Sequence, residues 1–197
     1  MKKPVMVAML LLVAVVANAG DGINSDIYFN KSVHITQNTK FVVLPFILTA
    51  SWAQTPNEAS TKKNVEDKNT EKFELSLLNA GVKVIERNKL DKLLSEQSLS
   101  KTGITESDSI KLGKILSADV IVLGTIPMWT YYEKTNKGFI EILIKGVVVE
   151  TGEIIFKTVF DSKINTTYDD FRYDMAQLET KSYKMLGEKI REAVEKK

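Results

Sequence analysis

The fold is decided by two runs of sequence, Val82-Lys-Val-Ile-Glu-Arg-Asn-Lys-Leu-Asp-Lys-Leu-Leu-Ser-Glu-Gln97 and Leu112-Gly-Lys-Ile-Leu-Ser-Ala-Asp119. The first run opens with a short apolar strand that ends at Glu86-Arg87. Leucines at three- and four-residue steps then indicate a helix with one buried face. A second helix and another apolar strand follow. This order predicts one half of a layered α/β domain.

Capping signals bound the helices of this region. Asn88 is a candidate N-cap of the first helix, and Asp91 places a negative charge near the exposed amides. Thr105-Glu-Ser-Asp108 is a capping-box pattern that opens the second helix. Gly113 costs about 1 kcal/mol relative to alanine in a helix interior. We therefore expect a neighbouring backbone to approach it closely.

Apolar runs on either side extend this pattern. Upstream, Phe41–Leu48 has no polar alternation, which predicts a strand covered on both faces, with Pro45 near its end. A helix is predicted from about Lys63 to Ala80, and Gly81 follows it as expected of a residue past a helix C-terminus. Downstream, residues 119–126 form another continuous apolar strand.

The C-terminal third changes character. Phe139–Val149 and Glu153–Phe160 flank the turn Glu150-Thr-Gly152, which predicts an antiparallel hairpin. From about Tyr168 the apolar residues recur with helical spacing, so a long amphipathic helix either covers the sheet or binds a partner. The predicted fold class is α/β. It has a mixed, mainly parallel sheet flanked by helices, a C-terminal antiparallel hairpin and a long C-terminal amphipathic helix.

The N-terminus has the features of an export signal. Lys2 and Lys3 precede the apolar run Val5–Ala17, and Ala17-Asn-Ala19 is a small-x-small cleavage site. The run is shorter than the roughly 20 residues of a membrane-spanning helix. We expect residues 1–19 to be a cleaved signal peptide, with an uncleaved anchor as the alternative. Residues 20–38 are then a lead-in with a possible edge strand at Val33–Thr36, and residues 39–197 a single α/β domain.

Composition argues against several function classes. Without the two lysines of the signal, basic and acidic residues are equal in number, so bulk charge gives no reason to expect nucleic acid binding. The chain has no cysteine, so core packing alone must hold the fold. A bacterial lipid anchor also needs a cysteine after the signal. We expect a periplasmic protein that is not a lipoprotein and has no transmembrane segment once the signal is removed.

The sequence contains no recognisable catalytic arrangement. His34 is the only histidine, and without cysteine it has no companions for a zinc site. Neither a phosphate-binding glycine loop nor a nucleophile elbow is present. We therefore predict that the protein is not an enzyme and uses no cofactor or metal.

Two charged pairs and three aromatic residues are candidates for contact with a partner or ligand. The pair at the end of the first strand lies where ligands bind in open α/β sheets. A local structural ion pair is the alternative, and both interpretations apply to the second charged pair. The aromatic residues either pack inside a hairpin or form an exposed contact surface. These candidates are Glu86, Arg87, Glu96, Gln97, Trp129, Tyr131 and Tyr132.

Short motifs along the chain resemble those of one family. They are Phe41-Val-Val-Leu-Pro-Phe46, Val84-Ile-Glu-Arg87, Leu90 to Gly103, Leu112 to Gly124 and Val148-Val-Glu-Thr-Gly-Glu153. In this order they resemble the CsgG-type family, which includes the curli-secretion channel component and is similar in fold to LpoB and the N-terminal domain of TolB. The resemblance implies a mixed sheet flanked by helices, no enzymatic activity and work through protein contacts.

The favoured hypothesis is a non-catalytic periplasmic accessory or adaptor protein with a CsgG-like domain over residues 39–197. It would contact envelope proteins in envelope assembly, secretion or peptidoglycan-synthase regulation, and could form a homo-oligomer. The alternative is a small-ligand-binding or weakly catalytic α/β domain that uses a cleft near Glu86, Arg87 and Asp119.

Overall fold

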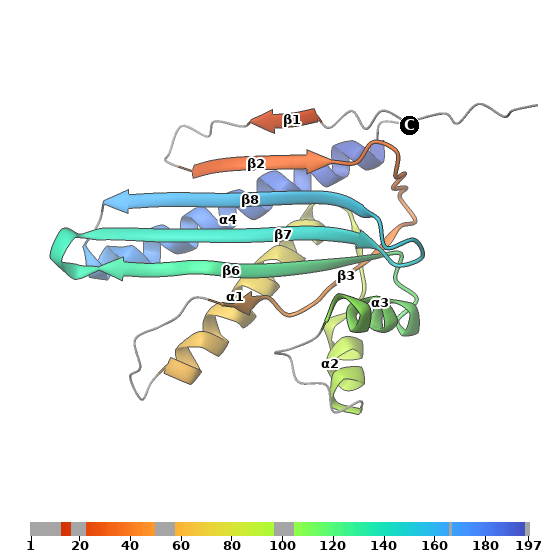
Figure 1. Cartoon of the computed structure of the whole chain (residues 1–197), viewed down its shortest axis with the longest axis horizontal. Coiled ribbons are helices and arrows are strands. Elements are labelled where there is room, and N and C mark those ends of the chain that lie inside the picture. The colour runs from red at the N-terminus through yellow and green to blue at the C-terminus, as the bar shows by residue number, and fades with distance from the viewer. Residues whose placement is uncertain (1–12, 17–22, 50–57, 97–104, 166, 196–197) are drawn as a thin grey trace, which may run out of the picture.

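The protein has one mixed sheet with helices on both of its faces (Figure 1). A computed structural model describes residues 13–16, 23–49, 58–96, 105–165 and 167–195. The helices are α1 (Glu58–Asn79), α2 (Arg87–Glu96), α3 (Glu106–Ile115) and α4 (Tyr168–Glu195), with a short 3-10 helix η1 at Glu133–Thr135. The strands are β1 (Val13–Val16), β2 (Ile23–Phe29), β3 (Lys40–Val43), β4 (Ile47–Leu48), β5 (Lys83–Val84), β6 (Val120–Tyr132), β7 (Lys137–Val148) and β8 (Ile154–Asn165).

The sheet is mostly antiparallel, so the prediction of a mainly parallel sheet is wrong. Its order is β1-β2-β8-β7-β6-β3-β5, with β4 also paired to β6. The parallel pairs are short and all involve β3 or β4: β3 pairs with β5 and β6, and β4 pairs with β6. The long pairs β2–β8, β8–β7 and β7–β6, and the β1–β2 pair, are antiparallel. The long strands β6, β7 and β8 are antiparallel because the connections between them are short. Short turns join β6 to β7 and β7 to β8, and a short turn can only join antiparallel neighbours.

Strand β6 is longer than predicted. Its pairing with β7 is irregular between Thr125 and Met128 and then resumes as far as Tyr132. Pro127 lies in this irregularity, where its missing amide proton is tolerated. The predicted hairpin with its turn at residues 150–152 is confirmed, and Gly152 has the positive φ (74°) that favours glycine.

The apolar run Phe41–Leu48 forms two strands and not one. Both β3 and β4 run parallel to β6, and Pro45 lies between them. In the gap, the backbone amide of Phe46 donates to Thr70 Oγ1 on α1 (2.9 Å) and not to a strand. The Phe46 ring packs over Gly124, where an added Cβ would lie 2.2 Å from it. The break therefore lets the chain put a large ring under helix α1.

Two hydrophobic clusters hold the helices to the sheet. The larger lies between the sheet and helices α1 and α4, which are behind the sheet in Figure 1. The smaller packs α2 and α3 against the other face, at the β3 end of the sheet. Phe171, Met175, Leu186 and Ile190 of α4 are buried in the larger cluster, so the C-terminal amphipathic helix covers the sheet as predicted.

Helices α1 and α4 are also joined by a buried polar network. Tyr183 on α4 is fully buried, and its hydroxyl donates to Asn69 Oδ1 on α1. Asn69 Nδ2 donates to Glu179 Oε1 (3.2 Å), and Lys72 pairs with the other oxygen of that carboxylate (2.6 Å). Burial, and then the nearby charge of Glu179, raises the pKa of Tyr183 well above its ordinary value.

Helix starts follow the capping signals only in part. Thr105 caps α3 as predicted, because its Oγ1 accepts from the Asp108 amide (3.2 Å). Helix α2, however, begins at Arg87, so Asn88 lies inside the helix and is not its N-cap. Gly113 is closely approached as predicted, but by side chains: an added Cβ would lie 2.8 Å from Val149 Cγ2.

The N-terminal region contributes more strand than expected. Strand β2 lies inside the predicted lead-in and pairs with β8 over its whole length. Val33–Thr36 is not a strand. Strand β1 pairs with β2 but lies within the predicted signal peptide, so cleavage after Ala19 would leave β2 as the sheet edge. Across the described part of the chain, none of the helices has the length and apolar character needed to span a membrane.

Candidate interaction surface

Arg87 ties helix α2 to helix α1. Its Nη2 lies 3.4 Å from Asp67 Oδ1 and its Nη1 lies 3.9 Å from Glu74 Oε1, both on α1. Its Nε lies 3.7 Å from Asp91 Oδ2, one turn further along α2. Glu86 is exposed, and its carboxylate accepts a hydrogen bond from the Asn88 side-chain amide (3.3 Å). This geometry favours the structural interpretation of Arg87.

Glu74 is the titratable group that this arrangement perturbs most. Burial raises the pKa of Glu74 from 4.5 to about 7, against the opposing effect of Arg87. The neighbouring carboxylates of Glu71 and Asp91 contribute smaller parts of this rise. Several carboxylates thus surround one guanidinium, and the pKa of Glu74 lies near neutral pH.

The predicted cleft does not bring its three residues together. Asp119 precedes β6, and its Oδ2 accepts from the Lys40 amide at the start of β3 (2.8 Å). Glu86 and Arg87 follow β5, which runs parallel to β3 from the same starting edge. Asp119 therefore lies at the beginning of the parallel strands, and Arg87 at their far end. Gln97 lies outside the described residues, as does the side chain of Glu96 at the end of α2.

The aromatic group divides between the two faces of the sheet. The Trp129 and Tyr131 rings pack on Phe171 of α4, with centroids 5.5 and 5.1 Å away. Tyr132 points to the opposite face, is 56% exposed and packs edge-on against Phe139 (5.7 Å). Trp129 and Tyr131 are therefore packed against the fold, whereas Tyr132 is exposed and available for contact.

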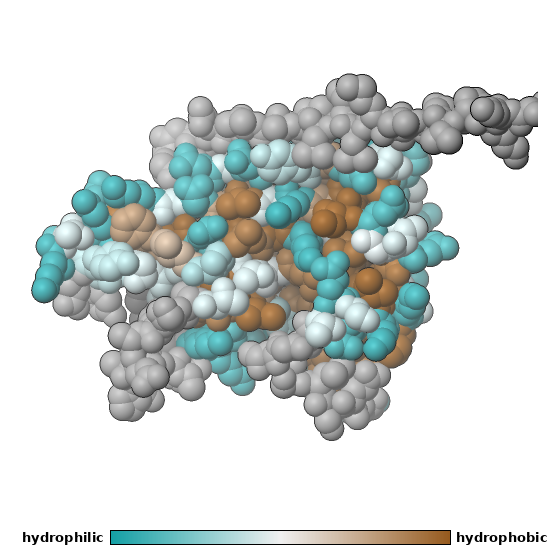
Figure 2. All heavy atoms as spheres, viewed as in Figure 1, coloured by the Kyte–Doolittle hydropathy of each residue, from teal (hydrophilic) through white to brown (hydrophobic). Residues whose placement is uncertain are grey.

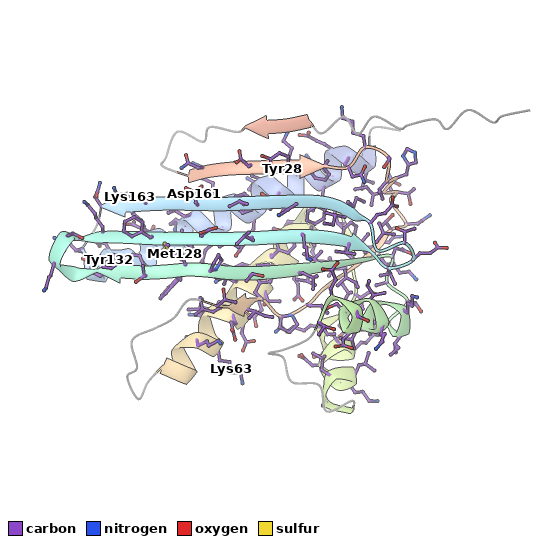
Figure 3. The ribbon with its side chains drawn as sticks, in the orientation of Figure 1. Tyr28, Lys63, Met128, Tyr132, Asp161 and Lys163 are labelled. Atoms are coloured by element: carbon purple, nitrogen blue, oxygen red, sulfur yellow. The ribbon has the colours of Figure 1, made fainter. Side chains whose placement is uncertain are left out.

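Tyr132 belongs to a broad sheet face that no helix of the larger cluster covers. Side chains alternate along β6, β7 and β8, so every second residue points away from α1 and α4. Figure 3 labels five of these residues, and Figure 2 shows polar and apolar atoms side by side on this face. We call it the open face, and define it by Asn24, Asp26, Tyr28, Thr125, Met128, Thr130, Tyr132, Phe139, Glu141, Leu143, Lys145, Lys157, Val159, Asp161 and Lys163.

The strand registers group these side chains into rows across the sheet. One row is basic, because Lys145 lies opposite Lys157. The next is apolar, with Leu143 opposite Val159. The third is acidic, with Glu141 opposite Asp161. Like charges directly opposite each other on neighbouring strands are destabilising, so the fold alone does not account for this pattern.

A fourth row near the β6–β7 turn holds Phe139, between Thr130 on β6 and Lys163 on β8. The Phe139 ring also contacts the ring of Tyr132, which lies diagonally across on β6, and Lys163 Nζ lies 5.9 Å from its centre. Met128, nearby on β6, is 41% exposed. Exposed aromatic and methionine side chains beside charged ones are typical of protein-binding surfaces. Sequence reasoning found Tyr132 but missed the rest of the face, because only the strand registers assemble it.

A metal or small-molecule site would need clustered ligands or a cavity among the described residues. Among them, no group of three or more histidine, aspartate or glutamate side chains is arranged to hold a metal ion. A cavity of about 10 Å³ between the sheet and α4, lined in part by Ile142, Ser162 and Glu179, has room for about one water molecule. His34 is exposed.

Comparison with known families supports the resemblance seen in the sequence. Residues 43–139 match the family described as curli production assembly/transport component CsgG. This segment contains most of β3, then β4 to β6, helices α1 to α3 and the start of β7. The resemblance to the CsgG family is therefore confirmed. A search of curated proteins gave no significant match.

Solved structures share the fold at low sequence identity. The PelC dodecamer from Paraburkholderia phytofirmans aligns with a TM-score of 0.52 and 10% identity, over 83% of this chain and 97% of that chain. The hypothetical protein CT253 from Chlamydia trachomatis aligns with a TM-score of 0.50 and 13% identity, over 78% of this chain and 95% of that chain. At such identities the likeness shows the fold alone. The C-terminal domain of LpoB from Salmonella enterica scores 0.36 at 17% identity, over 67% of this chain and 86% of that domain, too low to support a conclusion.

Proposed function

We propose that this protein is a non-catalytic accessory protein of the bacterial cell envelope and that it acts by binding other proteins on its open face. The CsgG-family match over residues 43–139 supports the envelope assignment. Export to the periplasm belongs to the proposal and is supported by the basic residues, apolar run and cleavage motif of the first 19 residues.

The observation that carries the proposal is the open face itself. Leu143 and Val159 at its centre belong to neither hydrophobic cluster of the fold. Met128 is exposed opposite Glu141 of the acidic row, and Tyr132 is exposed farther along β6, near the turn into β7. The rows on both sides of Leu143 and Val159 are charged. A surface with apolar and aromatic side chains framed by charges gains free energy when a partner excludes water from it.

Capture from intact cells tests this function. Cells are treated with a chemical crosslinker, and the tagged protein is isolated with its attached partners. We expect crosslinked complexes with the wild type and a loss of at least about fivefold with the double variant Met128→Ser/Tyr132→Ser, because exposed aromatic anchors carry much of the energy of an interface.

A matched control uses exposed apolar residues away from the open face. Leu75 on α1 is 57% exposed and Tyr173 on α4 is 66% exposed. The double variant Leu75→Ser/Tyr173→Ser should keep the complexes. Absence of complexes with the wild type, or their equal loss in both double variants, would contradict the proposal.

A further inference from the structure

We propose that a second copy of this chain binds the open face, in a two-fold arrangement that places Lys157 of each copy opposite Asp161 of the other. This inference rests on the proposed function and deepens it, because it names a partner for the same face. It follows from the order of the rows and their spacing.

The rows are evenly spaced and their charges are opposite on either side of the centre. Successive side chains on one face of a strand lie two residues apart, or about 7 Å. The basic row (Lys145, Lys157) and the acidic row (Glu141, Asp161) therefore lie at equal distances on either side of the apolar row. The open face thus has an apolar centre line with positive charge on one side and negative charge on the other.

Such a pattern is self-complementary under one kind of two-fold axis. An axis that runs along the apolar row, perpendicular to the strands, turns the basic row of one copy onto the acidic row of the other. It also packs Leu143 and Val159 against the same residues of the second copy. An axis parallel to the strands would instead place basic on basic and acidic on acidic, so the charges select the first arrangement.

Strand β2, the neighbour of β8, continues two of the rows but places a charge in the apolar row. Tyr28 continues the basic row and Asn24 the acidic row, so the two can hydrogen-bond across the interface. Asp26 continues the apolar row and would face its own copy at the exposed rim. Removing that charge should therefore strengthen the association.

Between the two copies, the main new ion pairs join Lys157 of one copy to Asp161 of the other. Lys145 already pairs with Glu106 of α3 within its own copy (2.5 Å). Lys157 and Asp161 are exposed on β8, and Asp161 accepts a hydrogen bond from the Asn24 side-chain amide (2.9 Å). In the free chain each of them lies opposite a like charge, and the second copy supplies the opposite charge.

Swapping the charges of Lys157 and Asp161 tests the arrangement. Dimerisation of the purified full chain is measured by analytical ultracentrifugation at low salt. The wild type should dimerise. Asp161→Lys alone and Lys157→Asp alone should each weaken dimerisation at least tenfold, because each places two like-charged contacts in the interface. An equimolar mixture of the two variants should dimerise again, since both contacts become attractive. The variant carrying both substitutions should do the same, and Asp26→Asn should dimerise more tightly than the wild type.

Charge-reversal substitutions on helix α4, away from the open face, provide the controls. Lys184 and Glu188 are exposed there, and Lys184→Asp and Glu188→Lys should leave dimerisation unchanged. A wild type that stays monomeric at about 100 μM, or variants of Asp161 and Lys157 that dimerise as the wild type does, would overturn the inference. If the chain is monomeric but the open face still captures a different protein from cells, the proposed function survives and this inference fails.

Discussion

At the scale of single residues, Arg87 is the side chain that fixes helix α2 against helix α1. Its guanidinium contacts Asp67 and Glu74 on α1 and Asp91 on α2. We expect Arg87→Ala to lower the free energy of unfolding by about 1–2 kcal/mol, because it leaves partly buried carboxylates without their cation. Urea unfolding at pH 8 measures this loss.

A double-mutant cycle with Glu74 tests the same interaction. The double variant Arg87→Ala/Glu74→Gln should be more stable than Arg87→Ala alone at pH 8, since the most buried of the three carboxylates around the missing guanidinium no longer carries a charge. Lys114→Ala, at an exposed position on α3, should change stability by less than about 0.5 kcal/mol. A full-sized loss in Lys114→Ala, or none in Arg87→Ala, would contradict the structural role.

Glu74 should also make the stability of the protein depend on pH. Its folded-state pKa of about 7 lies above the ordinary value of 4.5, so the folded chain binds this proton more tightly than the unfolded chain. The resulting stabilisation is fully present below pH 4.5 and is lost as the pH rises through 7.

The variant Glu74→Gln removes this dependence. It should match the wild type in stability near pH 4.5 and exceed it by about 1 kcal/mol at pH 8, after allowance for solvent screening. Thermal unfolding of both proteins across this pH range measures the difference. Parallel stability curves for the two proteins would show that Glu74 has an ordinary pKa.

At the scale of elements, the buried network between α1 and α4 holds two helices that are distant in sequence. Tyr183→Phe leaves Asn69 Oδ1 without its donor in a buried position, and should cost about 1–3 kcal/mol of unfolding free energy. Tyr173→Phe is the matched control, because Tyr173 lies on the same helix and is 66% exposed. Equal stability of these two variants in guanidinium unfolding would argue against the network.

Elements with strong local signals were predictable from the sequence. The capping threonine of α3, the turn before β8 and the apolar stripe of α4 all depend on residues close together in the chain. Asn69 is different, because it is a polar residue on the buried face of α1, between Val65 and Phe73. Its role became visible only when the fold brought Tyr183 and Glu179 to it.

At the scale of the whole molecule, the sequence predicted the antiparallel β7–β8 hairpin but not the mostly antiparallel sheet or the strand registers. The continuous apolar run predicted a strand that ends at Ile126, whereas the irregular pairing around Pro127 lets β6 continue to Tyr132. The sequence Ile23–Phe29 is too polar to stand out as a strand, yet it pairs with β8. Pairing between strands depends on contacts distant in sequence, so local composition does not determine it.

The open face was unpredictable for the same reason. Lys157 and Lys145 are neighbours only through the β7–β8 register, as are Asp161 and Glu141. Read along the chain, each of these residues is an ordinary charge on an exposed strand position. The regular alternation of basic, apolar and acidic rows exists only in the assembled sheet.

Site-specific photo-crosslinking in intact cells tests the central claim, that the open face is the surface through which this protein works. A photoreactive amino acid replaces either Tyr132 on the open face or Tyr173 on the outer side of α4, two exposed tyrosines on different surfaces. We predict light-dependent protein adducts from position 132 and few or none from position 173. No adduct from position 132, or adducts of equal yield from both positions, would contradict the claim.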